Sequence, residues 1–299
     1  MITKIKLLLG IVFYSFALSA QTDSIVNLQS YTPSKLLEKG QIDIKWFNNL
    51  YTQTQREDKG TVLTEPRTNS FTTSLEVIAG TSESKKFNLG LILEFRSNSF
   101  AGQDATSVFS FKNENSKSRF GLAHIAPTIK ISPFASLPRF TVQSSFFIPV
   151  FDRETNQNGY LANKSFIWQN RFFYDYAFEN PKFQLFSELG TRYFFGEKAK
   201  NDDGSSNING GYANSSIELS PGMFLSYFPT NKFTTLAFVQ HSQLIEIDNK
   251  FSQNYTALGF GVKYQFSNVL NLETLYSKFI RSNDAGLGQS FNLGLRAIF

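Results

Sequence analysis

The sequence predicts an all-β fold in which twelve antiparallel strands run up and down and close into a transmembrane barrel. Three observations lead to this prediction. Apolar and polar residues alternate over segments of about ten residues or more, as in spanning strands. Short and long polar connections alternate between these segments. After residue 20, no apolar stretch approaches the roughly 18 residues that indicate a spanning helix.

The composition agrees with a membrane barrel. Phenylalanine accounts for 33 of the 299 residues, more aromatic surface than a soluble protein tolerates, yet the mean hydropathy is −0.21. A wall whose side chains alternate between lipid and lumen explains both values. The chain has no cysteine, which excludes disulfides and thiolate metal sites. The net charge of +5 is too small and too dispersed to indicate a nucleic-acid partner.

The first twenty residues are typical of a cleavable secretory signal. Lys4 and Lys6 are followed by the apolar run 7–18 and by the small residues Ser19 and Ala20. The run is too short to span a bilayer, and a buried N-terminal helix is the alternative. We therefore predict a signal peptide at 1–20, an irregular lead-in at 21–39 and a barrel at 40–299.

The twelve strands follow from alternation, in chain order. Their predicted ranges are 40–54, 69–80, 86–98, 117–131, 138–149, 163–177, 182–196, 210–228, 232–246, 252–266, 269–281 and 290–299. The third is the most regular, with Phe87, Leu89 and Leu91 on one face. In the fourth, Ile125 and Ile129 disagree in phase with the preceding Phe120 and Leu122, and a β-bulge near Ala123 would reconcile them.

The other strands present an outward apolar face to which the sequence assigns aromatic residues near the ends, as expected at a membrane interface. In the ninth strand we assign Leu236 and Phe238 to this face. Tight turns are predicted at 80–85, 132–137, 177–181, 229–231 and 267–268. Longer loops are predicted at 55–68, 99–116, 150–162, 197–209, 247–251 and 282–289. Ten or fourteen strands are the alternative counts, and a soluble β-sandwich is the alternative fold.

The last ten residues form a strand that runs to the carboxyl terminus. Phe291, Leu293, Leu295 and Phe299 lie on one face and Arg296 on the other. Together with the secretory signal, this pattern resembles the terminal signal of Gram-negative outer-membrane β-barrel proteins. The resemblance implies that these four apolar residues are read as an assembly signal by a barrel-assembly machinery. It also implies location in the bacterial outer membrane, contact with its lipid, and periplasmic positions for both termini and for the 21–39 lead-in.

Charged residues of both signs are predicted to face the lumen in near-equal number. The candidate lumen-lining residues are Arg171, Glu188, Arg192, Glu218, His241, Lys263, Glu273 and Arg296. Arg171, Glu188 and Glu218 are expected to form a group at mid-height. Lys263, Glu273 and Arg296 are expected to form a second group close to Asp43 and Lys45.

A mixed interior argues against selection by ion charge, since selective channels use rings of one sign. The function predicted is therefore a narrow, porin-like channel for passive transport of small solutes, with the solute unidentified. Either the lead-in or the 99–116 loop could fold inward and narrow it. A closed structural or partner-binding barrel of a surface complex is the alternative.

An outer-membrane hydrolase is the third possibility. It would need a pair such as Ser220 and His241 on neighbouring strands. His241 and Ser242 are adjacent in one strand and point to opposite faces, so they cannot form such a pair. We predict no catalytic residue, no cofactor and no metal site.

Overall fold

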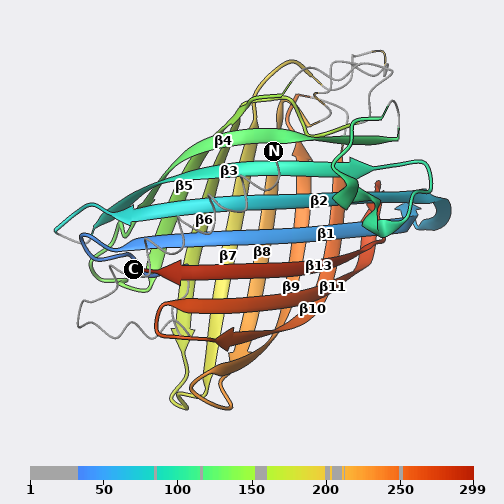
Figure 1. Cartoon of the computed structure of the whole chain (residues 1–299). Helices are drawn as coiled ribbons and strands as arrows, with labels where there is room; N and C mark the ends of the chain where they lie inside the picture. Colours follow the sequence, from blue (N-terminus) through green and yellow to red (C-terminus); the bar gives the residue numbers. More distant parts are fainter. Residues whose placement is uncertain are drawn as a thin grey trace.

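The computed structural model describes residues 33–83, 86–114, 117–151, 160–198, 203, 211, 213–248 and 252–299. The predicted signal peptide and residues 21–32 of the lead-in lie outside the described residues. The described part of the chain forms a closed antiparallel barrel of twelve long strands (Figure 1). None of its helices is long and apolar enough to cross a membrane.

The strands follow one another around the wall. They are β1 (Ile42–Asp58), β2 (Thr61–Gly80), β3 (Phe87–Ser99), β4 (Ser118–Ile131), β5 (Phe140–Pro149), β6 (Ile167–Ala177), β7 (Phe183–Phe194), β8 (Ser216–Tyr227), β9 (Phe233–Glu246), β10 (Gln253–Gln265), β11 (Leu270–Asn283) and β13 (Gln289–Ile298). Two further elements are the two-residue strand β12 (Ala285–Gly286) and the 3₁₀ helix η2 (Ala105–Ser110), which follows β3.

The last strand closes the barrel against the first. β13 pairs with β1 from Asp43 opposite Ile298 to Thr52 opposite Gln289, and β1 pairs with β2 on its other edge. The backbone of Phe299 continues the ladder, since Ile42 and Phe299 exchange two backbone hydrogen bonds of 3.0 Å. A closed ladder leaves no unpaired edge at the seam, as a structure in lipid requires. The predictions of twelve strands and of the closing pair are confirmed.

The bulge predicted in β4 is also confirmed. Glu94 of β3 lies opposite His124, but the next residue, Phe95, lies opposite Leu122, so Ala123 has no partner across the ladder. The extra residue shifts the alternation by one position. As a result, Leu122 and Ile125 share the outer face although they are three positions apart.

The face assignment of β9 was wrong. Leu236 and Phe238 of β9, predicted to face outward, point into the lumen, where both border a cavity. Phe238 lies opposite Phe224 of β8 with 5.2 Å between the ring centroids. Ala237 and Val239 are apolar too, so β9 has no clean alternation and its phase could not be determined from the sequence.

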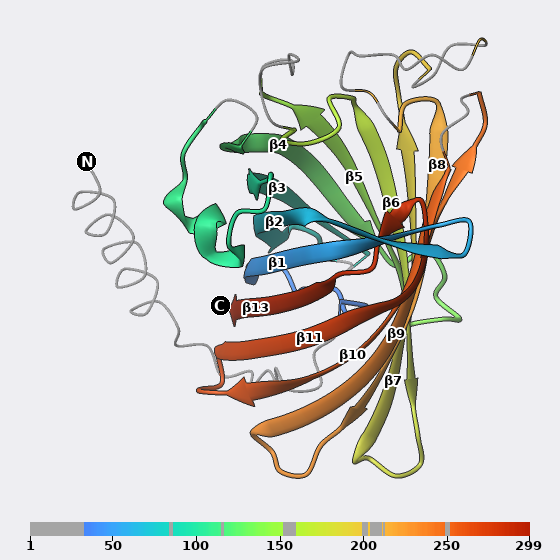
Figure 2. The same cartoon turned by 90° about the vertical axis from the view of Figure 1, so that its right-hand side faces the viewer.

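The barrel has two different ends. At the terminus end, which holds Ile42 and Phe299, the strands are joined by the short turns that the sequence predicted. At the opposite end, here called the loop end, two of the six predicted long loops are corrected. Residues 55–68 continue β1 and β2 into a twisted hairpin that turns at Lys59 and Gly60, whose φ angles are +48° and +81° (Figure 2).

The other corrected loop is 282–289, where β11 runs to Asn283 and β12 pairs with β1. Arg56 of the hairpin bonds both Glu65 of β2, at 2.9 Å, and Asp284, at 3.0 Å. These segments project beyond the wall and carry mostly polar residues, with adjacent apolar pairs such as Val62 and Leu63 in place of alternation. Their strands therefore lacked the apolar alternation on which the prediction depended.

Candidate functional site

The charged side chains of the lumen are arranged as ion pairs between neighbouring strands. Near the barrel seam, Arg296 of β13 makes two hydrogen bonds to Asp43 of β1, of 3.0 and 2.7 Å. Lys45 lies 3.2 Å from Glu76 of β2 and 3.9 Å from Asp43. Four charges from three strands thus neutralise one another at the seam. In a confined space of low dielectric constant, such pairing avoids the large cost of an uncompensated charge.

A second set of pairs lies across the barrel on β6 to β8. Arg171 binds Glu188 through two parallel bonds, Nε to Oε1 at 2.7 Å and Nη2 to Oε2 at 3.0 Å. Arg192 lies 3.5 Å from Glu218, which also accepts 2.9 Å hydrogen bonds from Ser220 and Ser242. These bonds hold the carboxylates in place and leave little free charge to act on an ion.

All eight candidate lumen residues border the lumen cavities, and seven of them belong to the lumen face; His241 belongs to the other face of β9. Arg171 and Glu188 are brought together as expected, while Glu218 pairs with Arg192 instead. Lys263 and Glu273 form a pair of 2.6 Å, and Arg296, which borders the same cavity, binds Asp43 of the neighbouring seam group. The alternation in the sequence indicated that these side chains face the lumen. It could not indicate the register between neighbouring strands, which determines the ion pairs.

His241 is held differently from the prediction. Its backbone position borders a lumen cavity together with Gln240, but its imidazole Nδ1 lies 2.9 Å from Thr256 Oγ1. Gln240 and Tyr255, the neighbours of these two residues in β9 and β10, point into the lumen, so His241 and Thr256 share the other face. The Ser220 hydroxyl donates to Glu218. The hydrolase pair of Ser220 and His241 is therefore not assembled.

An aromatic row that the sequence reasoning missed lies on the lumen face of four successive strands. Phe173, Phe186, Phe224 and Phe238 come from β6 to β9, and successive ring centroids are 5.7, 5.7 and 5.2 Å apart. The Arg171 guanidinium lies 4.9 Å from the centroid of Phe173. The four rings come from four different strands, so the row becomes visible only when the register aligns the strands.

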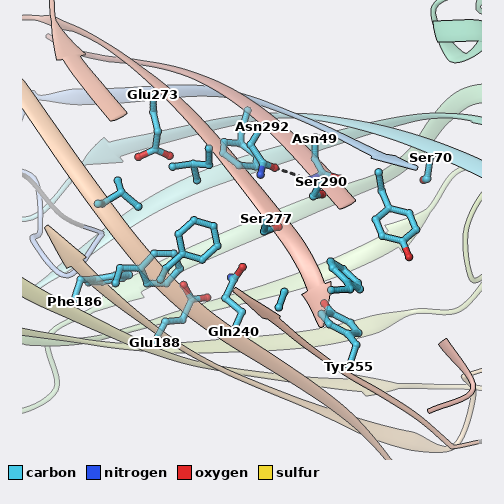
Figure 3. A pocket seen from close by; sticks show the side chains of 18 of the residues that line it. Asn49, Ser70, Phe186, Glu188, Gln240, Tyr255, Glu273, Ser277, Ser290 and Asn292 are labelled. Carbon is cyan, nitrogen blue, oxygen red and sulfur yellow. Dashed lines mark hydrogen bonds between the residues drawn. The ribbon is translucent and has the colours of Figure 1, made fainter. Parts of the chain in front are cut away.

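The main cavity, of about 650 Å³, lies between this aromatic row and a polar wall (Figure 3). On the polar wall, Asn49 donates hydrogen bonds of 2.6 Å to both Ser290 and Asn292. Figure 3 shows Asn49 and Asn292 across from Phe186 and Glu188. A solute in this space would therefore meet amide groups on one side and aromatic rings on the other.

Residues 33–39 of the lead-in cross the lumen at the terminus end. The backbone N–H and carbonyl of Leu37 both bond the Asn88 amide, at 2.8 and 3.2 Å, and Lys130 Nζ donates to the Lys35 carbonyl at 2.6 Å. The Ser34 hydroxyl donates to the Asp175 carboxylate on β6. Burial lowers the pKa of the Lys35 ammonium, against the opposing effect of Asp175. The prediction that the lead-in narrows the lumen is confirmed for residues 33–39.

Packing reinforces these bonds. The side chain of Leu37 is 2% exposed and belongs to an apolar cluster with Ile78 and Ile298. Only glycine fits at position 80, because a Cβ there would lie 1.8 Å from the Glu38 carbonyl oxygen. The wall residues thus form a close-packed binding site for residues 37–38 of the lead-in.

At the loop end, a different segment from the one considered folds inward. The Asn98 amide on the lumen face of β3 donates to the carbonyls of Tyr160 and Leu161, at 2.8 and 2.9 Å. Leu161 is buried with Ala123 and Phe151. Residues 99–114 of the predicted 99–116 loop lie on the outer wall instead, where the ring centroid of Phe109 is 5.0 Å from that of Phe71. Its inward folding, one of two options weighed, is therefore excluded.

A buried apolar cluster lies in the lumen and joins residues of β3 to β7 and β9 with Ala213, which precedes β8. Its members are Ile92, Ala126, Phe147, Ile167, Phe194, Ala213 and Leu244. The main cavity instead reaches the loop end beside β1, β10 and β12, at Gln53, Gln253 and Gly286. The open space therefore runs off the barrel axis, along the side that includes the seam.

No protein-family model matches the chain, and no curated protein sequence is significantly similar to it. Solved structures do resemble it. The COG4313 outer membrane channel from Pseudomonas putida F1 superposes with a TM-score of 0.64 at 12% identity, over 90% of this chain and 99% of that one. The β domain of the Bordetella autotransporter BrkA gives a TM-score of 0.53 at 12% identity, over 86% and 99%. The fold is that of bacterial outer-membrane β-barrels.

Proposed function

We propose that the chain is a narrow outer-membrane channel that passes small, uncharged solutes by passive diffusion along the off-axis cavity. The observation that carries the proposal is the pairing of lumen charge. Arg171 with Glu188, Lys263 with Glu273, and the seam group around Asp43 leave no ring of one sign. The terminus end would face the periplasm, with the lead-in as its cover.

The two walls of the cavity favour solutes that have both a polar and a planar apolar part. Amides such as Asn49 and Gln240 offer hydrogen bonds, and Phe186 and Phe224 offer stacking surfaces opposite them. The channel would bind such a solute weakly at several places, as conduction requires.

Liposome uptake of two neutral solutes tests this proposal. We expect phenyl glucoside to enter proteoliposomes faster than its size alone predicts, relative to glucose. Phe224→Ala should reduce that preference, whereas Leu225→Ala, on the outer face of the same strand, should leave it unchanged. Absence of both uptake and single-channel conductance would refute the channel.

A closed barrel with a structural or partner-binding role is the second candidate. It is favoured by the segments at the two ends, since Leu37 and Leu161 are both buried inside the barrel. Crosslinking in whole cells followed by purification separates the two proposals. A channel should be recovered alone, apart from assembly factors, and a member of a surface complex should be recovered with a stable partner.

A further inference from the structure

The outer wall of the barrel carries polar side chains where β2 and β3 reach the loop end. Asn69, Ser97 and Ser99 alternate on the outer face, next to the apolar positions of Phe71 and Phe95. Their exposed fractions are nevertheless only 2%, 3% and 0%. A segment of the chain covers them: the connection between β3 and β4, which includes η2.

This connection is fixed to the wall by specific hydrogen bonds. The Asn69 amide donates to the carbonyls of Gln103 and Asp104, both at 3.1 Å. Ser97 Oγ donates to the carbonyl of Val108 at 2.6 Å, and Val108 is 1% exposed against the wall. The polar outer positions thus bind the backbone of the connection, which lies beside the ends of β2 and β3 (Figure 2).

Two aromatic rings form the new outer surface of this region. Phe109 packs edge-on against Phe71 at 5.0 Å, and Phe111 packs against Phe120 at 5.2 Å. Their outward sides remain free, with exposed fractions of 46% and 48%. Both rings therefore continue the apolar outer surface of β2 and β4 and do not stand in solvent above it.

The height of the rings places them at the edge of the membrane. Outward apolar residues of β3 begin at Phe87, the terminus-end limit of that strand. With a rise of about 3.3 Å per residue and a tilt of about 40°, an apolar band about 25 Å tall that starts at Phe87 ends near Ser97. The carbonyl of Val108, adjacent to Phe109, is bonded to Ser97. Aromatic rings are favoured at this boundary between hydrocarbon and headgroups.

We propose that the β3–β4 connection is a membrane-surface contact, in which Phe109 and Phe111 insert into the boundary of the lipid leaflet at the loop end. The occupant of this surface is the lipid that surrounds the barrel, because the rings are continuous with the outer band that the lipid already covers. The inference is independent of the solute and of whether the lumen is open.

The chain has no cysteine, so single-cysteine variants of the full-length protein can each carry one spin label. The Phe109→Cys label is compared in phosphatidylcholine vesicles with two reference sites, Leu91→Cys on the outer face of β3 and Val62→Cys at the tip of the hairpin. Relaxation by oxygen reports lipid, and relaxation by a water-soluble nickel chelate reports water. Heat-modifiable migration on gels confirms that each variant is folded.

We expect the Phe109→Cys label to be several-fold more sensitive to oxygen than to nickel, as for Leu91→Cys, with a depth between the two references. A label at Phe109→Cys that is as accessible to nickel as the one at Val62→Cys would overturn the proposal. Shielding from both reagents would also overturn it, in favour of contact with a second copy of the chain. Thr106→Cys, three residues before Phe109 and so on the same side of the 3₁₀ helix η2, gives a second label that leaves both rings intact, and the same lipid signature is expected there.

Discussion

Asn88 of β3 holds Leu37 of the lead-in as a strand neighbour would, by accepting from its N–H at 2.8 Å and donating to its carbonyl at 3.2 Å. Asn88 is 1% exposed, so no water replaces these bonds. Asn88 is thus one of the wall residues, with Lys130 and Asp175, that hold the segment covering the terminus end, and its attachment can be tested without altering the segment.

Asn88→Ala should release the lead-in. Losing two buried hydrogen bonds costs about 1–3 kcal/mol, enough to raise the population of a displaced segment by about fivefold to a hundredfold. Planar-bilayer recordings should then show more frequent or larger openings than the unaltered barrel. Asn170→Ala, on the outer face of β6, is the matched control and should conduct like the unaltered protein. Equal conductance of the two variants would mean that the lead-in does not limit passage.

Gly80→Ala tests the same segment by steric means. The new Cβ would lie 1.8 Å from the Glu38 carbonyl, so the lead-in must move although its hydrogen-bonding groups are unchanged. We expect increased conductance, of the same sign as for Asn88→Ala. Gly121→Ala is the control, because the nearest atom to its Cβ is Leu161 Cδ2, at an ordinary 3.6 Å. An unaltered conductance in Gly80→Ala together with an increase in Gly121→Ala would contradict this assignment.

Much of the fold was predictable because the wall of a membrane barrel imposes a period of two on its strands. The closing pair of β1 with β13 and the bulge at Ala123 both follow from that rule. It failed where the constraint is absent. The hairpin formed by the ends of β1 and β2 extends beyond the wall, where no lipid face opposes a lumen face. In β9, the residues around Phe238 are apolar on both faces.

The partners within the lumen could not be predicted for a different reason. Alternation assigns a residue to a face, but a shift of register by two residues keeps the face and changes every neighbour. Arg296 could have met Glu273 and instead binds Asp43. The binding site for Leu37 could not be predicted for the same reason, since its residues Asn88, Ile78 and Ile298 come from three different strands.

Glu188→Gln tests the neutrality of the lumen. The substitution leaves the Arg171 guanidinium without its two-bond partner and should destabilise the barrel by about 3–5 kcal/mol, because a confined charge loses its compensation. The urea midpoint should fall, and reversal potentials should shift toward anion preference. The double variant Arg171→Met, Glu188→Leu restores neutrality and should recover most of the stability and the lack of selectivity. A selectivity that is unchanged in Glu188→Gln would show that ions pass elsewhere.

Phe299→Ala separates folding from assembly. The backbone of Phe299 completes the seam with Ile42 whatever its side chain is, so in vitro refolding into detergent should proceed with little change. In cells, if the terminal ring is read by a barrel-assembly machinery, the amount of heat-modifiable barrel in the outer membrane should fall several-fold. Phe266→Ala, at an exposed turn of the terminus end, removes an equivalent ring outside the terminal strand and should assemble normally. Equal losses in both variants would instead attribute the effect to aromatic anchoring in the membrane, because that is the property that the two rings share.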